Sequence, residues 1–83
     1  MKYRLVYRRR ATRSLARIWL AADDRAAVTR AGDRLERYLT NDPLGVGESR
    51  SGDDRVIVVD PLVAFYTVDA PNRKVVVNDI RSP

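Results

Sequence analysis

The chain has 83 residues and a mass of 9.4 kDa, contains neither cysteine nor histidine, and carries a net charge of +5. This length allows one domain with a modest core, so residues 1–83 are assigned to a single domain. The missing cysteine and histidine exclude disulfide frameworks, thiolate metal sites and imidazole catalysis, and we expect no metal and no cofactor. No run approaches the about 18 apolar residues of a membrane span, which predicts a cytoplasmic protein without membrane contact.

Positive charge is concentrated in the first half of the chain. Residues 1–37 hold eleven basic and four acidic side chains, whereas residues 38–83 hold five basic and seven acidic ones. Most of the basic residues are arginine, whose planar fork suits phosphate or carboxylate groups. The charge pattern therefore indicates a nucleic acid or an acidic protein as partner.

The first predicted element is a strand over residues 2–8, in which apolar and charged residues alternate. From Ala11 the apolar residues return at helical spacing, which predicts a short amphipathic helix ending near Ala22. Leu15 and Trp19 lie on its apolar side. We expect Trp19 in the core, or with Leu15 in a groove that receives a partner helix.

A second helix is predicted after Asp23 and Asp24, whose carboxylates suit the cap of a helix N-terminus. Its apolar stripe includes Tyr38, and Asn41-Asp42-Pro43 ends it. Residues 44–54 are rich in glycine, serine and aspartate, which predicts a loop. Because so few residues join the two helices, they form a hairpin that must bury its apolar stripes on a sheet.

Three closely spaced strands are predicted at residues 55–59, 62–68 and 74–80, with turns at Asp60-Pro61 and residues 69–73. Connections this short make the strands antiparallel. The middle strand is apolar nearly throughout, which is typical of a strand covered on much of both faces. The predicted fold is α+β, in the order β-α-α-β-β-β.

Several short motifs follow one another along this framework. Asp42-Pro43-Leu44 ends the second helix, Arg55 opens a strand, Tyr66-Thr67-Val68-Asp69 lies on the next strand, and Arg81 follows the last one. With the order of elements, these motifs resemble the RelE/ParE toxin superfamily, in particular its plasmid-stabilisation branch. The resemblance implies a helical hairpin packed on a curved, mainly antiparallel four-stranded sheet. It also implies that the chain is the toxin of a type II toxin–antitoxin system and that it assembles with a cognate antitoxin encoded by an adjacent gene.

Members of this superfamily either cleave mRNA at the ribosome or act on DNA gyrase. Cleavage through the 2′-hydroxyl needs a proton acceptor, cations and an acid. In the ribosome-dependent nucleases an arginine commonly lies just ahead of the tyrosine on the penultimate strand, and a histidine or tyrosine follows the last strand. Here these positions hold Val63 and Ser82-Pro83, so two of the expected catalytic side chains are missing.

The remaining catalytic candidates are Glu48 as a base and Arg50, Arg55 and Arg81 as phosphate clamps. We expect the three arginines to face one groove, which would also serve to bind a target. The simpler interpretation is that Glu48 is a solvated charge and that the arginines pair with nearby aspartates. Tyr66 is the tyrosine that the family pattern singles out, and a role in packing the sheet with its hydroxyl hydrogen-bonded is its simpler interpretation.

A positive stripe leads from the end of the first strand onto the first helix, formed by Arg8, Arg9, Arg10, Arg13 and Arg17. Such a stripe is able to follow a phosphate backbone or to attract acidic antitoxin side chains. The alternative is that it is the solvated side of an amphipathic helix.

Three functions remain open. The first is a toxin that inhibits growth by binding an essential target such as gyrase, and we favour it because it needs no catalytic residues. The second is a ribosome-dependent mRNA endoribonuclease. The third is a toxin-fold protein that has lost toxicity and only binds an antitoxin.

Overall fold

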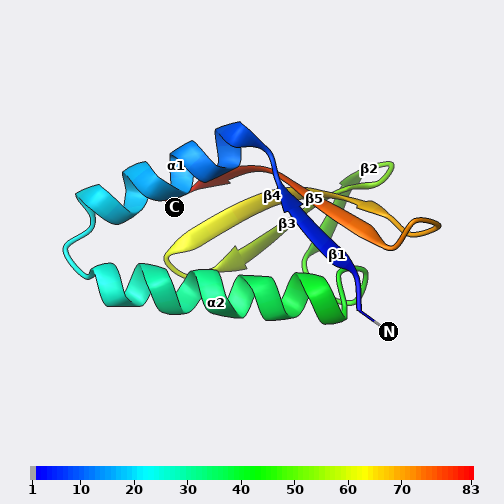
Figure 1. Cartoon of the computed structure of the whole chain (residues 1–83), viewed down its shortest axis with the longest axis horizontal. Helices are drawn as coiled ribbons and strands as arrows, with labels where there is room; N and C mark the ends of the chain where they lie inside the picture. Colours follow the sequence, from blue (N-terminus) through cyan, green and yellow to red (C-terminus); the bar gives the residue numbers. More distant parts are fainter. Residues whose placement is uncertain (1) are drawn as a thin grey trace.

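The computed structural model describes residues 2–83, which form two helices and five strands. In chain order the elements are β1 (Arg4–Tyr7), α1 (Arg9–Ala21), α2 (Arg25–Asn41), β2 (Glu48–Ser51), β3 (Asp54–Val59), β4 (Leu62–Asp69) and β5 (Lys74–Arg81). Figure 1 shows both helices lying along the sheet. Neither of them is long and apolar enough to cross a membrane.

The strands form one sheet in the order β1-β5-β4-β3-β2. β1 runs parallel to β5, and the other neighbours are antiparallel. The α+β class and the predicted order are therefore confirmed, but the sheet has five strands and the prediction of four was wrong. The additional strand, β2, lies within residues 44–54, which we predicted to be a loop. All four of its residues are exposed and polar, so it forms through its ladder with β3 and shows no apolar alternation.

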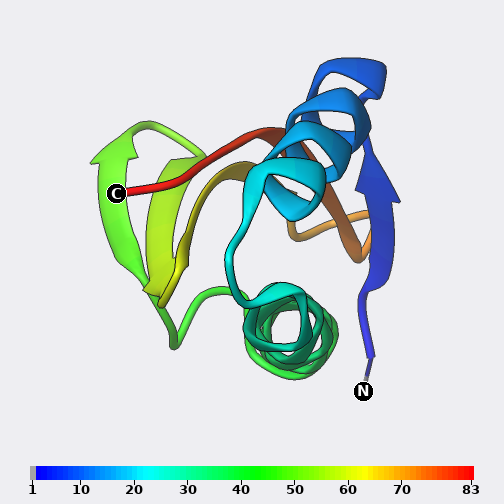
Figure 2. The same cartoon turned by 90° about the vertical axis from the view of Figure 1, so that its left-hand side faces the viewer.

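Both helices cover the same face of the sheet, as predicted, and the view in Figure 2 shows the sheet curving around them. α1 packs mainly on β5, whereas α2 contacts β1, β3 and β4. The helices contribute Ala11, Val28, Ala31, Leu35 and Leu39 to the core. The strands contribute Ile57, Val59, Leu62, Ala64, Tyr66, Val68, Val75, Val77 and Ile80.

The other face of the sheet, which we call the outer face, carries no helix. Because side chains alternate along a strand, every second residue points to this face, and the register shows which residues of neighbouring strands lie side by side there. They are Arg4 and Val6 of β1, Lys74 and Val76 of β5, Val63, Phe65, Thr67 and Asp69 of β4, and Asp54, Val56 and Val58 of β3. Val58 is 65% exposed. The expectation that β4 is covered on both faces is therefore wrong, since only its helix-facing residues are buried.

The connection between the helices is held by side chains at both of its ends. The Asp24 carboxylate accepts a hydrogen bond from the Ala27 amide at 3.0 Å, which confirms the predicted cap of α2. The Arg25 guanidinium donates to the carbonyls of Trp19 and Leu20 at 3.2 and 3.0 Å. Arg25 therefore provides a donor for the Leu20 carbonyl and a second donor for the Trp19 carbonyl, which also accepts from the Ala22 amide.

Candidate functional site

A broad groove lies between α1, α2, the turn after β3 and the end of β5, with a volume of about 1390 Å³. We call it the hairpin groove. Its apolar lining comes from both helices and the sheet, and includes Ile18, Val28, Pro61 and Ile80. Its cations are Arg10, Arg17, Arg30, Arg34, Arg37 and Arg81. The groove thus combines apolar surface with arginines, although aspartates from the α1–α2 connection, α2, the turn after β3 and β5 also line it.

The predicted basic stripe on α1 contributes only part of this groove. Arg10 and Arg17 line it, whereas Arg9 and Arg13 do not, and all four are exposed. The three arginines from α2 were not predicted as site residues. Their spacing in the sequence places them along α2, but only the position of α1 beside it shows that they line a groove.

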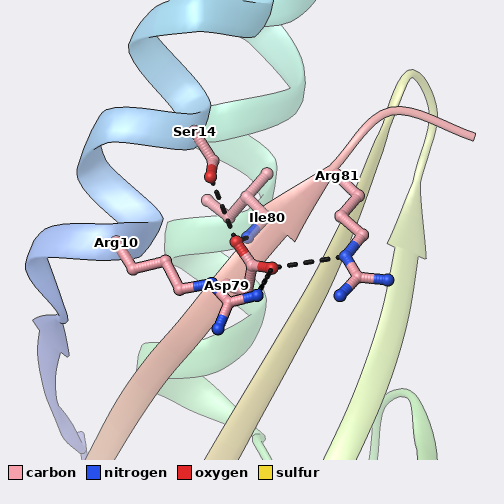
Figure 3. Close-up of polar contacts among 5 residues, drawn as sticks. All are labelled: Arg10, Ser14, Asp79, Ile80 and Arg81. Atoms are coloured by element: carbon pink, nitrogen blue, oxygen red, sulfur yellow. Dashed lines mark hydrogen bonds and ion pairs between the residues drawn. The ribbon is translucent and has the colours of Figure 1, made fainter.

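Asp79, one of the aspartates near the candidate arginines, is the centre of a polar cluster beside α1 (Figure 3). Its carboxylate is almost fully buried and accepts hydrogen bonds from the Ser14 hydroxyl at 3.1 Å and from the Ile80 amide at 2.9 Å. Arg81 donates to it through Nε at 3.2 Å, and the Nη2 atom of Arg10 lies 3.4 Å away. One carboxylate therefore holds an arginine from α1 and an arginine from the end of β5.

The pKa of Asp79 follows from these contacts. Burial raises this pKa, but the hydrogen bonds from Arg81, Ser14 and the Ile80 amide, together with the Arg10 charge, outweigh burial and lower it below the ordinary value. Asp79 therefore stays ionised and is a poor proton acceptor. The simpler interpretation of Arg81, pairing with an aspartate, is confirmed.

Arg55 is committed to the loop that follows α2. Its Nη2 atom donates to the carbonyls of Leu44, Val46 and Gly47 at 3.2, 3.1 and 3.4 Å. Its Nε atom is buried without a hydrogen-bond partner within residues 2–83. The guanidinium of Arg55 thus holds backbone carbonyl groups in place and offers little surface to a ligand.

Tyr66 on β4 is hydrogen-bonded to the same loop. Its side chain is fully buried, and its hydroxyl donates to the carbonyls of Pro43 and Val46, each at 3.0 Å. Both acceptors belong to the loop that follows α2. This geometry confirms the packing interpretation of Tyr66.

The four catalytic candidates are not brought together. The register places Arg55 opposite Tyr66, on the helix-facing side, whereas Glu48 lies opposite Val56 on the outer face. Arg81 lines the hairpin groove and Arg55 does not, so the expectation that the arginines face one groove is wrong. Arg50 lies at the irregularity of β2 and has no residue paired with it in the ladder.

A chain of hydrogen bonds crosses the outer face instead. The Nε atom of Arg8 donates to the Asn78 side-chain oxygen, the Asn78 amide donates to the Thr67 hydroxyl, and this hydroxyl donates to Asp54, each at 2.8 Å. The chain links the end of β1 to β5, β4 and β3. This chain of hydrogen bonds was not predicted, because its four residues meet only through the strand register.

Trp19 does not lie in the core, so that prediction was wrong. It is 39% exposed, its indole donates to the Thr29 hydroxyl at 3.2 Å, and the Arg25 guanidinium lies over its ring at 4.7 Å. Tyr38, also expected in a buried stripe, is 42% exposed. Leu15 is partly buried against the core. An antitoxin-binding role for Trp19 and Leu15 stays a prediction.

Solved structures share this fold over almost their whole length. A chain of the toxin–antitoxin complex RelBE2 from Mycobacterium tuberculosis matches with a TM-score of 0.83 at 15% identity, over 100% of this chain and 93% of that one. The chromosomal ParDE system from P. aeruginosa matches with a TM-score of 0.71 at 16% identity, over 96% and 95%. The archaeal RelE–RelB complex from Pyrococcus horikoshii OT3 matches with a TM-score of 0.71 at 13% identity, over 99% and 96%.

No protein-family model and no curated protein matches the chain. Sequence identities this low establish the fold alone. The chain therefore has the fold of the RelE/ParE toxin superfamily, and the resemblance noted from its sequence is confirmed at that level.

Proposed function

We propose that the protein is the toxin of a toxin–antitoxin system and that it inhibits growth by binding an essential protein, with DNA gyrase as the favoured target. The fold supports the first part, because its structural neighbours were solved as toxin–antitoxin complexes. Both candidate targets, gyrase and the ribosome, lie in the cytoplasm, and the proposal places the protein there.

The arrangement of the sheet supports binding over RNA cleavage. Val63 occupies the position where the nucleases of this fold commonly carry an arginine, and it lies on the outer face between Val58 and Arg81. A valine neither stabilises a phosphorane nor transfers a proton. The valine on β4, with Val58 rather than a cation beside it on β3, is the observation that carries the proposal.

The nuclease alternative uses Arg50, Arg55 and Arg81 with an unidentified base, for which Glu48 is a candidate. Arg55 is committed to the carbonyls of the loop after α2. Glu48 lies on β2 and Arg81 on β5, three strand spacings apart, or about 14 Å. General acid–base catalysis needs groups within hydrogen-bond reach of the same substrate atoms, and arginine does not exchange a proton near pH 7. The geometry therefore favours a toxin that binds its target, and cleavage remains the second candidate.

The hairpin groove suits the antitoxin. An amphipathic segment is commonly held by a groove with apolar walls, and acidic side chains on that segment would meet the arginines of α1 and α2. We propose that the cognate antitoxin, encoded next to this gene, lays such a segment into the groove. Binding of an acidic segment would also give the groove arginines of α1 and α2 a role that needs no catalytic residue.

Controlled expression in a bacterial host tests the toxin proposal. We expect growth arrest with a DNA-damage response, rescue by the neighbouring gene product, and inhibition of purified gyrase. New cuts in transcripts spaced by codons, without DNA damage, would replace the gyrase proposal with the nuclease. Unimpaired growth would leave a protein that only binds an antitoxin.

A matched pair of variants tests the groove. Arg17→Glu changes a groove residue, whereas Arg13→Glu makes the same charge change on α1 outside the groove. We expect Arg17→Glu to weaken antitoxin binding, measured by calorimetry, at least about tenfold more than Arg13→Glu, because a reversed charge repels an acidic segment. Equal effects would mean that the antitoxin binds elsewhere.

A further inference from the structure

The outer face is too apolar for a solvated sheet face. An antiparallel sheet with one open side normally carries polar residues there. Here six of the residues on the outer face are apolar, namely Val6, Val56, Val58, Val63, Phe65 and Val76. Val6 is 38% exposed and Val58 is 65% exposed. A contiguous apolar sheet face of this kind indicates an interaction surface.

The charges around this apolar area are separated by sign. The cations on one side of the outer face are Arg4, Arg8 and Lys74, which belong to β1, to the residue after it and to β5. Arg81, at the end of β5, is paired with Asp79 and lies over the Phe65 ring at 5.2 Å. The acidic residues on the other side are Asp54 of β3 and Glu48 of β2, whereas Asp69 lies on the middle strand β4 with Lys74 as its ladder neighbour. Arg4 and Lys74 are direct neighbours in the ladder, and like charges so placed repel each other. One side of the outer face is therefore positive and the other negative.

We propose that two copies of the chain pair through their outer faces, around a two-fold axis that runs parallel to the strands along β4. β4 is the middle strand of the sheet, so this axis places β1 of one copy over β2 of the other and β5 over β3. Each cationic side then faces an acidic side. A two-fold interface requires such a self-complementary surface.

The register supplies specific pairs. Glu48 lies in the row of residues across the sheet that runs through Val56 and Phe65 to the irregularity of β5. Arg8 lies at the other end of this row, where it is bonded to Asn78. The axis therefore brings Arg8 of one copy to Glu48 of the other. The axis brings Phe65 to Phe65 at the centre, where the Arg81 guanidinium of each copy lies 5.2 Å from its own Phe65 ring. It also brings Asp69 to Asp69 at the end of β4, where Lys74 is the ladder neighbour of each carboxylate. Two sheets packed in this way lie about 10 Å apart, which suits an apolar layer with a charged border.

A second copy fits this face better than RNA does. The phosphate backbone needs a continuous positive surface, and Asp54 and Glu48 would repel it over half of the outer face. A partner with one uniform charge would be repelled by one side or the other. The separated charges are matched by a surface with the opposite arrangement, which another copy of the chain provides.

Sedimentation velocity of the purified full chain over a range of concentrations tests the pairing. We expect the mass to rise with concentration from that of one chain, 9.4 kDa, to twice that value, and to fall again at high salt. Arg8→Glu and Glu48→Arg should each weaken the dimer about tenfold or more, since each places like charges face to face. The double variant restores opposite charges and should recover most of the affinity.

Two further variants separate pairing from folding. Val58→Lys places a second cation against Arg81 of the other copy and should prevent pairing, because Val58 is exposed and its replacement leaves the core intact. Glu36→Arg makes the charge change of Glu48→Arg on α2, on the opposite side of the molecule, and should leave the dimer unchanged. Circular dichroism verifies that every variant is folded.

A wild-type chain that stays monomeric at every concentration would overturn the proposal, and so would a dimer indifferent to Val58→Lys or to the charge reversals. The inference does not depend on the toxin proposal. A monomer that arrests growth would contradict the pairing alone, and a dimer that leaves growth unimpaired would contradict toxicity alone.

Discussion

Tyr66 and Arg55 lie directly opposite each other on β4 and β3 and donate to the same acceptor, the carbonyl oxygen of Val46, at 3.0 and 3.1 Å. Both side chains therefore hold the loop between α2 and β2 against the sheet. This arrangement explains why an arginine and a tyrosine are needed at these positions without any catalytic role.

Replacing Tyr66 with phenylalanine tests this function. Tyr66→Phe keeps the ring but leaves the Pro43 carbonyl without its donor, so the free energy of unfolding should fall by about 1–3 kcal/mol. Urea denaturation followed by circular dichroism measures the change. Tyr38→Phe, at an exposed tyrosine, serves as the control and should alter stability by less than about 0.5 kcal/mol. Similar losses in both variants would show that the buried hydroxyl does not stabilise the loop.

Asp79 predicts a dependence of stability on pH. A carboxyl whose pKa is lowered in the folded state adds stability above its ordinary pKa of about 4, and this stability is lost as the pH falls through the lower folded value. Asp79→Asn should therefore cost about 1 kcal/mol near pH 7, because Arg10 and Arg81 lose a charged acceptor. The difference between wild type and variant should shrink once the pH drops below about 4.

Thermal unfolding of both proteins between pH 2 and 7 measures this dependence. Asp69→Asn is the control, because the Asp69 carboxylate, at the end of β4, accepts hydrogen bonds from the neutral Asn72 and from no arginine within residues 2–83. A stability difference for Asp79→Asn that stays constant over the whole range would show that the carboxylate charge is not what stabilises the cluster.

The contact between Arg25 and Trp19 in the α1–α2 connection can be tested by fluorescence, because Trp19 is the one tryptophan of the chain. Arg25→Met removes the cation above its ring and the donor to the carbonyls of Trp19 and Leu20. We expect a loss of about 1 kcal/mol in stability and a shift of the indole emission to longer wavelength. Arg30→Met changes an exposed arginine on the same helix and should leave the emission unchanged. If Arg25→Met also left it unchanged, the stacking would be absent in solution.

The sequence predicts the helices, β1, three of the four later strands and the N-terminal cap of α2, because each depends on nearby residues. Apolar spacing marks β4, and the Asp24 carboxylate caps α2 from within its first turn. β2 was missed because Glu48-Ser49-Arg50-Ser51 has no apolar residue and forms only by pairing with β3. A strand of this kind is determined by its neighbour.

The errors at Trp19 and Tyr38 have another origin. Helical spacing identifies the side of a helix that faces the protein, but it does not show how far the sheet extends beneath each turn. Trp19 lies near the end of α1, where Arg25 and Thr29 cover its ring in place of the sheet. For the same reason the Asp79 cluster was not predicted, since Arg10 and Arg81 are 71 residues apart in the chain and meet only in the folded protein.

Gly47 and Gly52 both have a left-handed backbone, but only Gly47 lies in the loop that Tyr66 and Arg55 hold. Replacing each of them by alanine therefore distinguishes the cost of backbone strain from the cost of crowding in that loop. Gly47 has φ +68°, and a Cβ atom there would lie 2.6 Å from the Val56 carbonyl and 2.7 Å from the Tyr66 hydroxyl. Gly52 has φ +56°, and a Cβ atom there would meet nothing within 4 Å. Gly52→Ala should therefore cost about 1–2 kcal/mol, from the backbone alone.

Gly47→Ala carries the same backbone cost and also displaces the Tyr66 hydroxyl from its two carbonyl acceptors. We expect it to lower the free energy of unfolding by about 1–3 kcal/mol more than Gly52→Ala does. Urea denaturation of both variants gives this difference, and in the Tyr66→Phe background it should shrink, because the hydroxyl that the added methyl group would crowd is gone. Equal costs for the two glycines would mean that the loop moves aside freely and that Tyr66 and Arg55 do not fix its position.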